Sequence, residues 1–146
     1  MPSPVLSVIV PAYNEDAVLT AFHRRLAATL DRLGEPAEVL YVNDGSDDRT
    51  LAVVGRLRAA DPRVAVLDLS RNFGKEIALT AGLHHARGEA VVVIDADLQD
   101  PPELILELVE CWRRRRADIV YAQRRERAGE TLSKRTTARL FYLLRQ

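Results

Sequence analysis

Apolar residues occur along the chain in short runs that alternate with longer segments of helical spacing. Each run predicts a buried β-strand; the runs are "VLSVIV" (5–10), "EVLYV" (38–42), "VAVLDL" (64–69), "AVVVID" (90–95) and "DIVYA" (118–122). The segments between them predict helices over 15–33, from 46–50 to about 60, over 75–86, from 101 or 102 to about 116, and from 130 to the end. Strands that alternate with helices predict an α/β fold, in which helices cover both faces of a mostly parallel sheet.

Length and composition fit one globular domain with a substantial core. The chain has 146 residues, 47% hydrophobic and 29% charged, which excludes a disordered chain. Its single cysteine, Cys111, excludes an internal disulfide and a cysteine-based zinc site. No apolar run approaches the roughly 18 residues of a membrane span, and no signal peptide is visible, so we expect this domain in the cytoplasm.

The charge is unevenly distributed, although its sum is zero. Residues 1–100 carry ten basic and fifteen acidic side chains, whereas residues 101–146 carry eleven and six. The basic end indicates an anionic partner such as a phosphate or a membrane surface, and a solvated helical face explains it equally well. The predicted helix over 129–146 is amphipathic and basic, which fits both binding to a membrane surface and packing on the domain. It has no stop signal, so we expect the chain to be truncated.

Polar and charged residues follow all five predicted strands, and in a parallel sheet such segments meet at one edge, where ligands bind. The segments are "PAYNE" (11–15), "NDGSDD" (43–48), "SRNFGKE" (70–76), "DADLQDPP" (95–102) and "QRRERAGE" (123–130). No glycine-rich G-x-G-x-x-G motif follows the first strand, which argues against a dinucleotide site, and there is no phosphate-binding P-loop.

The second segment favours contact with a nucleobase. Asn43, Asp44 and Gly45 alone are typical of a hairpin turn, but the next segment is helical, which favours a sharp strand-to-helix turn at Gly45. Asp44 would then project from the strand end, where its carboxylate can accept hydrogen bonds from a base. The ring of Tyr13 either covers that base or packs within its own loop.

Asp95 and Asp97 are the most informative pair. On an extended backbone, carboxylates two residues apart lie on the same side, about 6–7 Å apart. They repel each other unless a cation or a ligand hydroxyl lies between them, and carboxylate oxygens suit Mg²⁺ or Mn²⁺. Gln99 can add a carbonyl ligand. The alternative is that Asp97 or Asp100 merely caps the helix that begins at Pro101.

Two groups of basic residues lie in these segments and can bind phosphate. Arg71 and Lys75 belong to the third segment, and Arg124, Arg125 and Arg127 to the fifth. The run 113–116, by contrast, ends a helix, whose C-terminal dipole favours cations.

The motifs "PAYNE", "NDGSDDRT", "SRNFGKEIALTAGLHHARGEAVVVIDADLQDPPELI" and "DIVYAQRRERAGETLSKR" resemble those of family 2 glycosyltransferases with a GT-A fold. Within that family the chain resembles the enzymes that load a sugar onto a polyprenyl phosphate, such as dolichol-phosphate mannosyltransferases and bactoprenol glucosyltransferases. The resemblance implies a Rossmann-like three-layer α/β/α sandwich. It also implies a catalytic domain over 1–128 and the start of an interfacial helix over 129–146.

The resemblance also implies roles for single residues. The residues implied to bind the nucleotide sugar are Pro11, Ala12, Tyr13, Glu15, Val42, Asp44, Lys75, Asp95, Ala96 and Asp97. Asp97 and Gln99 would bind Mg²⁺ or Mn²⁺, and Asp95, Asp97 and Arg124 would be the catalytic residues. Arg124 would meet the diphosphate or the acceptor phosphate.

The implied reaction is an inverting, metal-dependent transfer from a UDP- or GDP-linked sugar to undecaprenyl or dolichyl phosphate, at the cytoplasmic face of a membrane. Because the acceptor phosphate is already ionised, no strong general base is required. Transmembrane helices usually follow this domain in the family. A polysaccharide or protein acceptor, a nucleotide-binding subunit without turnover and a nucleotidyltransferase are the alternatives. We expect no nucleic-acid partner, and self-association stays open.

Overall fold

The computed structural model describes residues 3–116, 118–122 and 141–145. Its elements are β1 (Leu6–Ala12), α1 (Leu19–Leu33), β2 (Ala37–Asn43), α2 (Thr50–Ala60), β3 (Val64–Asp68), α3 (Lys75–His85), β4 (Ala90–Val93), α4 (Leu104–Arg115), β5 (Ile119–Ala122) and β6 (Phe141–Arg145). The five predicted strands and the first four predicted helices are confirmed, with shifted ends.

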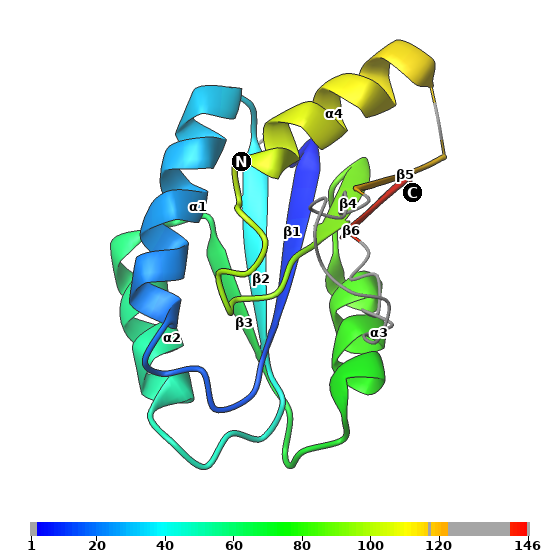
Figure 1. The fold of residues 1–146 in the computed structure, drawn as a ribbon. Coiled ribbons are helices and arrows are strands. Elements are labelled where there is room, and N and C mark those ends of the chain that lie inside the picture. Colours follow the sequence, from blue (N-terminus) through cyan, green and yellow to red (C-terminus); the bar gives the residue numbers. More distant parts are fainter. Residues whose placement is uncertain (1–2, 117, 123–140, 146) are drawn as a thin grey trace, which may run out of the picture.

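The described strands form one sheet with the order β3-β2-β1-β4-β6-β5 (Figure 1). Strands β1 to β4 are mutually parallel, and β6 pairs antiparallel with both β4 and β5. The predicted mostly parallel sheet is therefore confirmed. The carboxyl ends of β1, β2, β3 and β4 meet at one edge, which we call the carboxyl edge.

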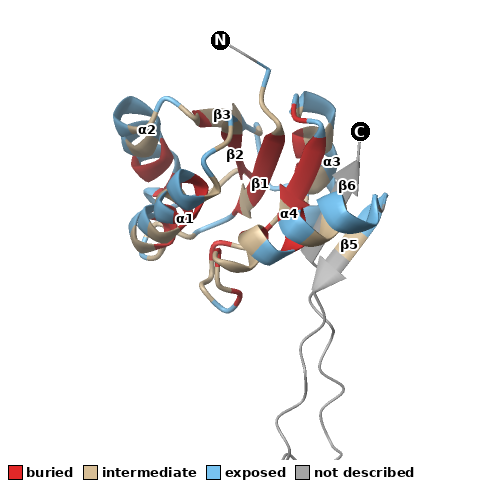
Figure 2. Cartoon of the chain, turned by 90° about the horizontal axis from the view of Figure 1, so that it is seen from above, coloured by how far each residue is buried: buried red, intermediate tan, exposed pale blue. Residues whose placement is uncertain are grey.

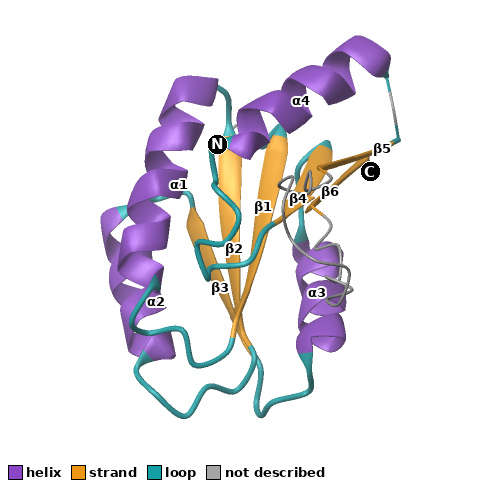
Figure 3. Cartoon of the chain, in the orientation of Figure 1, coloured by secondary structure: helices purple, strands orange, loops and turns teal. Residues whose placement is uncertain are grey.

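Helices cover both faces of the sheet (Figure 3). On one face, Phe22 and Leu26 of α1, Val54 of α2 and Ile105 of α4 pack in one cluster with Val8 of β1 and other strand residues. On the other face, Ala78 of α3 packs with Ile9, Val42 and Val91. The buried positions concentrate in the central strands between these helices (Figure 2). This arrangement is the predicted three-layer α/β/α sandwich.

The predicted helix from Glu130 to the chain end is wrong for residues 141–145, which form strand β6. Residues 129–140 of the predicted interfacial helix lie outside the described residues. A run of four apolar residues, "FYLL", does not distinguish a helix from a strand by its spacing. Strand β4 has β1 on one side only, so its other side offers unpaired backbone groups, and β6 pairs with them.

Strand β1 was predicted to end at Val10, before Pro11. In the structure it continues to Ala12. Proline lacks a backbone N–H, which disfavours it inside a sheet. Here β4 pairs with β1 only as far as Ile9, so Pro11 has a partner strand on one side, where it lies opposite Val42. The predicted strand over 90–95, by contrast, ends earlier than predicted, at Val93. This changes the geometry of the acidic pair described below.

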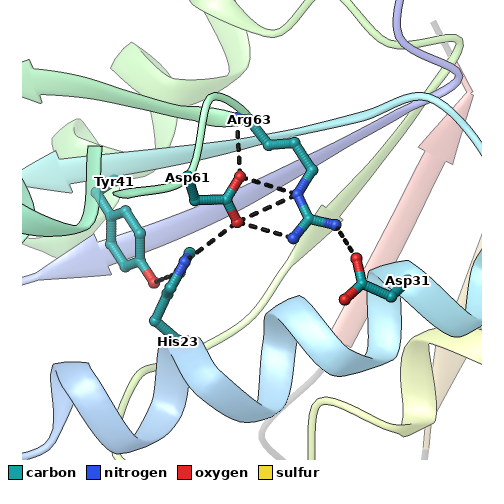
Figure 4. A network of polar contacts seen from close by, with 5 residues as sticks. All are labelled: His23, Asp31, Tyr41, Asp61 and Arg63. Atoms are coloured by element: carbon teal, nitrogen blue, oxygen red, sulfur yellow. Dashed lines mark hydrogen bonds and ion pairs between the residues drawn. The ribbon is translucent and has the colours of Figure 1, made fainter. Parts of the chain in front are cut away.

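A buried polar network connects α1 to β2 and to the turn between α2 and β3 (Figure 4). His23 lies 3.0 Å through Nδ1 from the Tyr41 hydroxyl, and 3.3 Å through Nε2 from Asp61 Oδ2. Arg63 donates to both oxygens of Asp61 and to Asp31. Burial lowers the pKa of His23, although the neighbouring Asp61 carboxylate acts in the opposite direction. The folded chain therefore holds this imidazole in its neutral form.

This network predicts acid sensitivity. The pKa of His23 is lower in the folded state than its unfolded value of about 6.5, so the unfolded state binds more protons. Stability is then fully present above about pH 6.5 and falls as the pH drops below it, by at most about 1.4 kcal/mol per pH unit. In urea titrations at pH 7.5 and 5.5, His23→Gln should show a smaller acid-induced loss than the unmodified chain. Equal losses in the two proteins would contradict this assignment.

Candidate functional site

Side-chain hydrogen bonds join the first two loops of the carboxyl edge, residues 13–18 after β1 and 44–49 after β2. The Asn14 N–H donates to Ser46 Oγ at 3.0 Å, and the Asp47 N–H donates to Asn14 Oδ1 at 2.9 Å. The Glu15 N–H donates to Thr50 Oγ1 at 2.8 Å. Helix α1 begins only at Leu19, later than predicted. The two loops therefore hold each other's backbone in place.

The third loop, residues 69–74 after β3, lies directly against Gly45. This glycine has a φ of +64°, and a Cβ atom built on it would lie 2.2 Å from the carbonyl carbon of Arg71 and 2.4 Å from the amide nitrogen of Asn72. Only glycine combines that conformation with so close an approach of another backbone. The predicted sharp turn at Gly45 is thus confirmed, and it brings the second and third loops together.

Asp44 binds the third loop and is only 3% exposed. Its Oδ1 accepts a hydrogen bond from the Phe73 N–H at 2.8 Å, and its Oδ2 accepts one from the Gly74 N–H at 3.0 Å. The predicted contact between Asp44 and a base stays a prediction. Each carboxylate oxygen can accept a second bond, so a base would share these oxygens with the loop.

The three loops line a cavity of about 430 Å³ at the carboxyl edge that is open to solvent, and its volume is within the range of small-molecule sites. Tyr13 lines it from the first loop, Gly45 and Asp47 from the second, and Arg71 and Asn72 from the third. Tyr13 is 42% exposed, so a planar ligand in the cavity could reach its side chain.

Two polar residues at strand ends hold one wall of this cavity and were not among the predicted site residues. Asn43 Nδ2 donates to Asp68 Oδ1 at 2.8 Å, which joins the ends of β2 and β3. Asn43 Oδ1 accepts a hydrogen bond from the Ser46 hydroxyl at 2.6 Å. Their position in the sequence could have indicated them, because each is a polar residue at the carboxyl end of its strand.

The acidic pair lies beyond the end of β4, in a turn. The last backbone bond to β1 runs from the Ile94 N–H to Ile9 O, and Ala96 and Asp97 form a turn that continues into Leu98 with a φ of +60°. The prediction that Asp95 and Asp97 share one side of an extended strand is therefore wrong. The Gln99 N–H donates to Asp97 Oδ1 at 3.0 Å, which places both predicted metal ligands in this turn.

Asp95 forms an ion pair with Lys75, the first residue of α3. The Lys75 Nζ lies 2.6 Å from one carboxylate oxygen of Asp95 and 2.7 Å from the other. The first residue of α3, directly after the third loop, is thus joined to the acidic turn by a direct contact.

Negative charge accumulates where the first loop faces the acidic turn. Burial raises the pKa of the Glu15 carboxyl, and the charges of Asp97, Asp95 and Asp48 raise it further. The carboxylates that act on Glu15 thus come from the second loop and from the acidic turn. Such a region attracts cations.

The donor set fits Mg²⁺ or Mn²⁺ bound together with a ligand. In the part of the chain that the structure describes, no three His, Cys, Asp or Glu side chains converge so as to hold a metal ion by themselves. Mg²⁺ characteristically takes one or two protein carboxylates and completes its shell with substrate phosphates and water. The oxygens of Asp97 and Gln99 match that chemistry, and a phosphate-bearing ligand would have to supply the rest.

Several residues that the family resemblance implicates do not present side chains to the cavity. Ala12, Val42 and Ala96 are buried in the core, with Val42 fully enclosed beneath α3. Pro11 is partly buried in β1. Arg124 lies outside the described residues. Among the helices that the structure describes, none has the length and hydrophobicity needed to cross a bilayer.

Comparisons with known proteins agree with this architecture. A glycosyltransferase of Bacillus subtilis, named YkcC and described as uncharacterized, is 51% identical over 138 residues, which make up 94% of this chain and 42% of the relative. A bactoprenol glucosyl transferase of Shigella phage SfV is 42% identical over 139 residues, 95% of this chain and 45% of the relative. The chain therefore spans less than half the length of these relatives.

Solved structures share the fold. The mannosyltransferase PcManGT of Pyrobaculum calidifontis, in complex with GDP-Man and Mn²⁺, superposes with a TM-score of 0.65 at 29% identity, covering 75% of this chain and 32% of that protein. Residues 1–349 of S. aureus TarS, in complex with UDP-GlcNAc, give a TM-score of 0.68 at 25% identity, covering 88% and 37%. The family description "Glycosyl transferase family 2" matches residues 7–146. The chain thus belongs to glycosyltransferase family 2, and the expected GT-A fold is confirmed.

Proposed function

We propose that this chain binds a UDP- or GDP-linked sugar at the carboxyl edge and, as part of a metal-dependent inverting glycosyltransferase, transfers the sugar to a polyprenyl phosphate. The observation that carries the proposal is that one short segment, residues 71–75, contacts both the cavity and the acidic turn. The cavity has Arg71 and Asn72 in its wall, and a few residues further Lys75 contacts Asp95 in the acidic turn. A ligand with a base at one end and a diphosphate at the other matches this arrangement.

The relatives support the classes of donor and acceptor. The Shigella phage relative is named for transfer to bactoprenol, a polyprenol. The structural neighbours hold GDP-Man with Mn²⁺ in one case and UDP-GlcNAc in the other. We extend these classes of donor and acceptor to the present chain, and we place the reaction at the cytoplasmic face of a membrane.

In this proposal the base occupies the cavity against Tyr13, and the diphosphate extends toward Asp95 and Asp97. Asp97 and Gln99 would hold Mg²⁺ or Mn²⁺, which when bound would supply positive charge near the diphosphate. Arg124 supports the same charge or the acceptor phosphate. Glu15 closes the acidic side of the site.

The positions of the histidines agree with an acceptor that needs no general base. His23 belongs to the network with Tyr41 and Asp61, away from the cavity. His84 and His85 lie in the last turn of α3, which ends at the edge of the sheet opposite the site. A polyprenyl phosphate is ionised at neutral pH, so attack on the anomeric carbon requires orientation and charge neutralisation by the site.

A donor panel tests the proposal. The chain is incubated with radiolabelled UDP-glucose, UDP-N-acetylglucosamine or GDP-mannose, together with polyprenyl phosphate in micelles and either Mg²⁺, Mn²⁺ or EDTA. We expect one donor to give an organic-soluble labelled lipid that does not form with EDTA. Calorimetry measures donor binding in parallel. Binding without transfer to any acceptor would favour a non-catalytic nucleotide-binding subunit, and the absence of binding by all donors would contradict the proposal.

A further inference from the structure

We propose that Lys75 is the positioning residue for the diphosphate end of the donor, and that Asp44 in turn positions Lys75. This inference rests on the proposed function and deepens it. It assigns a short path, from Asp44 through residues 73–74 to Lys75 and Asp95, that couples the nucleoside cavity to the acidic turn.

The contact between Lys75 and Asp95 is close and symmetric. Both carboxylate oxygens lie within 2.7 Å of the Lys75 ammonium, although the lysine side chain is 56% exposed. An exposed lysine loses side-chain entropy when it is held in one position, and such pairs contribute little to stability by themselves. The pair therefore acts on ligand binding, where the ammonium offsets the negative charge of Asp95.

The backbone before Lys75 is held from two sides. Asp44 accepts hydrogen bonds from the Phe73 and Gly74 N–H groups, and the Asn72 side chain also accepts from the Gly74 N–H at 3.0 Å. Gly74 has a φ of +95°, and α3 begins at the next residue. Asp44 therefore determines where the first turn of α3, and with it Lys75, begins.

The charges around Lys75 explain how it would favour binding of a diphosphate. Asp95, Asp97 and Glu15 form a negative region that repels an approaching diphosphate. Lys75 neutralises one of these charges and remains exposed enough to donate further hydrogen bonds to phosphate oxygens. Its removal should therefore weaken binding of the diphosphate and leave binding of the nucleoside, in the cavity on the other side of residues 72–74, unchanged.

The first test separates the two ends of the ligand. Using the base selected by the donor panel, the affinities for the nucleoside and for its diphosphate are measured by NMR titration and calorimetry, with and without Mg²⁺. Lys75→Gln should weaken the affinity for the diphosphate by about tenfold or more. It should change the affinity for the nucleoside by less than about twofold. Lys75→Arg should restore most of the diphosphate affinity. Arg58→Gln is the matched control, because it removes one exposed positive charge from the last turn of α2 at the opposite edge.

The second test follows the path itself and needs no ligand. Asp44→Asn should speed hydrogen exchange at the Phe73 and Gly74 amides, while Lys75→Gln should not. With ligand, the two substitutions should be non-additive for diphosphate affinity, since they act on one contact. If Lys75→Gln weakened the affinities for nucleoside and diphosphate equally, or weakened neither, the role of Lys75 would be overturned. Additive effects would overturn the coupling to Asp44. If the unmodified chain bound neither ligand, the proposed function would fail first.

Discussion

Replacing Asp97 by alanine is expected to abolish cation-dependent binding of the nucleotide sugar, with a loss in affinity of about 100-fold or more. Changes to groups that merely support metal ligands cost about 10- to 100-fold in affinity, and Asp97 is proposed as a ligand itself. The described residues offer no cluster of three side chains that could hold the ion without it. Loss of this one carboxylate would therefore remove the ion and the positive charge that it would supply near the diphosphate.

Titration calorimetry with Mn²⁺ and then with excess EDTA measures this effect. We expect the unmodified chain to bind the donor tightly only with the cation, and Asp97→Ala to bind weakly in both conditions. Asp118→Ala is the matched control, because it removes an exposed carboxylate just before β5, at the far edge of the sheet. Donor binding that is independent of metal and unchanged in Asp97→Ala would refute the role given to Asp97.

Gly45→Ala is expected to destabilise the chain by about 2–5 kcal/mol, the largest effect on stability that we predict. A left-handed conformation costs a residue with a Cβ about 1–2 kcal/mol, and forcing an extra methyl group into a packed site costs about 1–3 kcal/mol. At Gly45 both apply, since the new atom would meet the backbone of Arg71 and Asn72. The third loop would have to move away, and the cavity that it lines would open.

Two other glycines separate these contributions in urea unfolding experiments. Gly34 has a φ of +70°, but no atom lies within 4 Å of the position that a Cβ would take there, so Gly34→Ala should show only the conformational cost of about 1–2 kcal/mol. Gly55 lies inside α2 with open space around it, so Gly55→Ala should stabilise the chain by about 0.5–1 kcal/mol. If Gly45→Ala cost no more than Gly34→Ala, the close contact between the second and third loops would not hold in solution.

The parts of the fold that follow from periodicity were predictable. The alternation of buried runs and helical segments places β1 to β4 and α1 to α4 in the correct order, because each element buries a recognisable face against the next. Strand β6 was not predictable in this way. Its short apolar run fits either type of element, and the choice depends on an open sheet edge at β4, which is a tertiary property.

The candidate site was predictable as a location and less so in its internal contacts. Parallel strands bring their carboxyl ends together, so polar residues after several strands indicate one edge. The bonds from Asp44 to Phe73 and Gly74 join positions about thirty residues apart, and no local pattern encodes them. The turn that contains Asp97 was not predictable from local sequence either, because it depends on where β4 stops pairing with β1.

In the proposed function, one ligand spans the cavity and the acidic turn. Amide chemical-shift mapping by NMR, with Mg²⁺ present throughout, measures whether both regions contact the same ligand. Addition of the nucleotide sugar should shift the amides of Gly45, Ser46 and Asn72 around the cavity and also those of residues 95–99, whereas the bare nucleoside should shift only the first set. Shifts confined to one of the two sets with the complete donor, or located away from the carboxyl edge, would contradict the account.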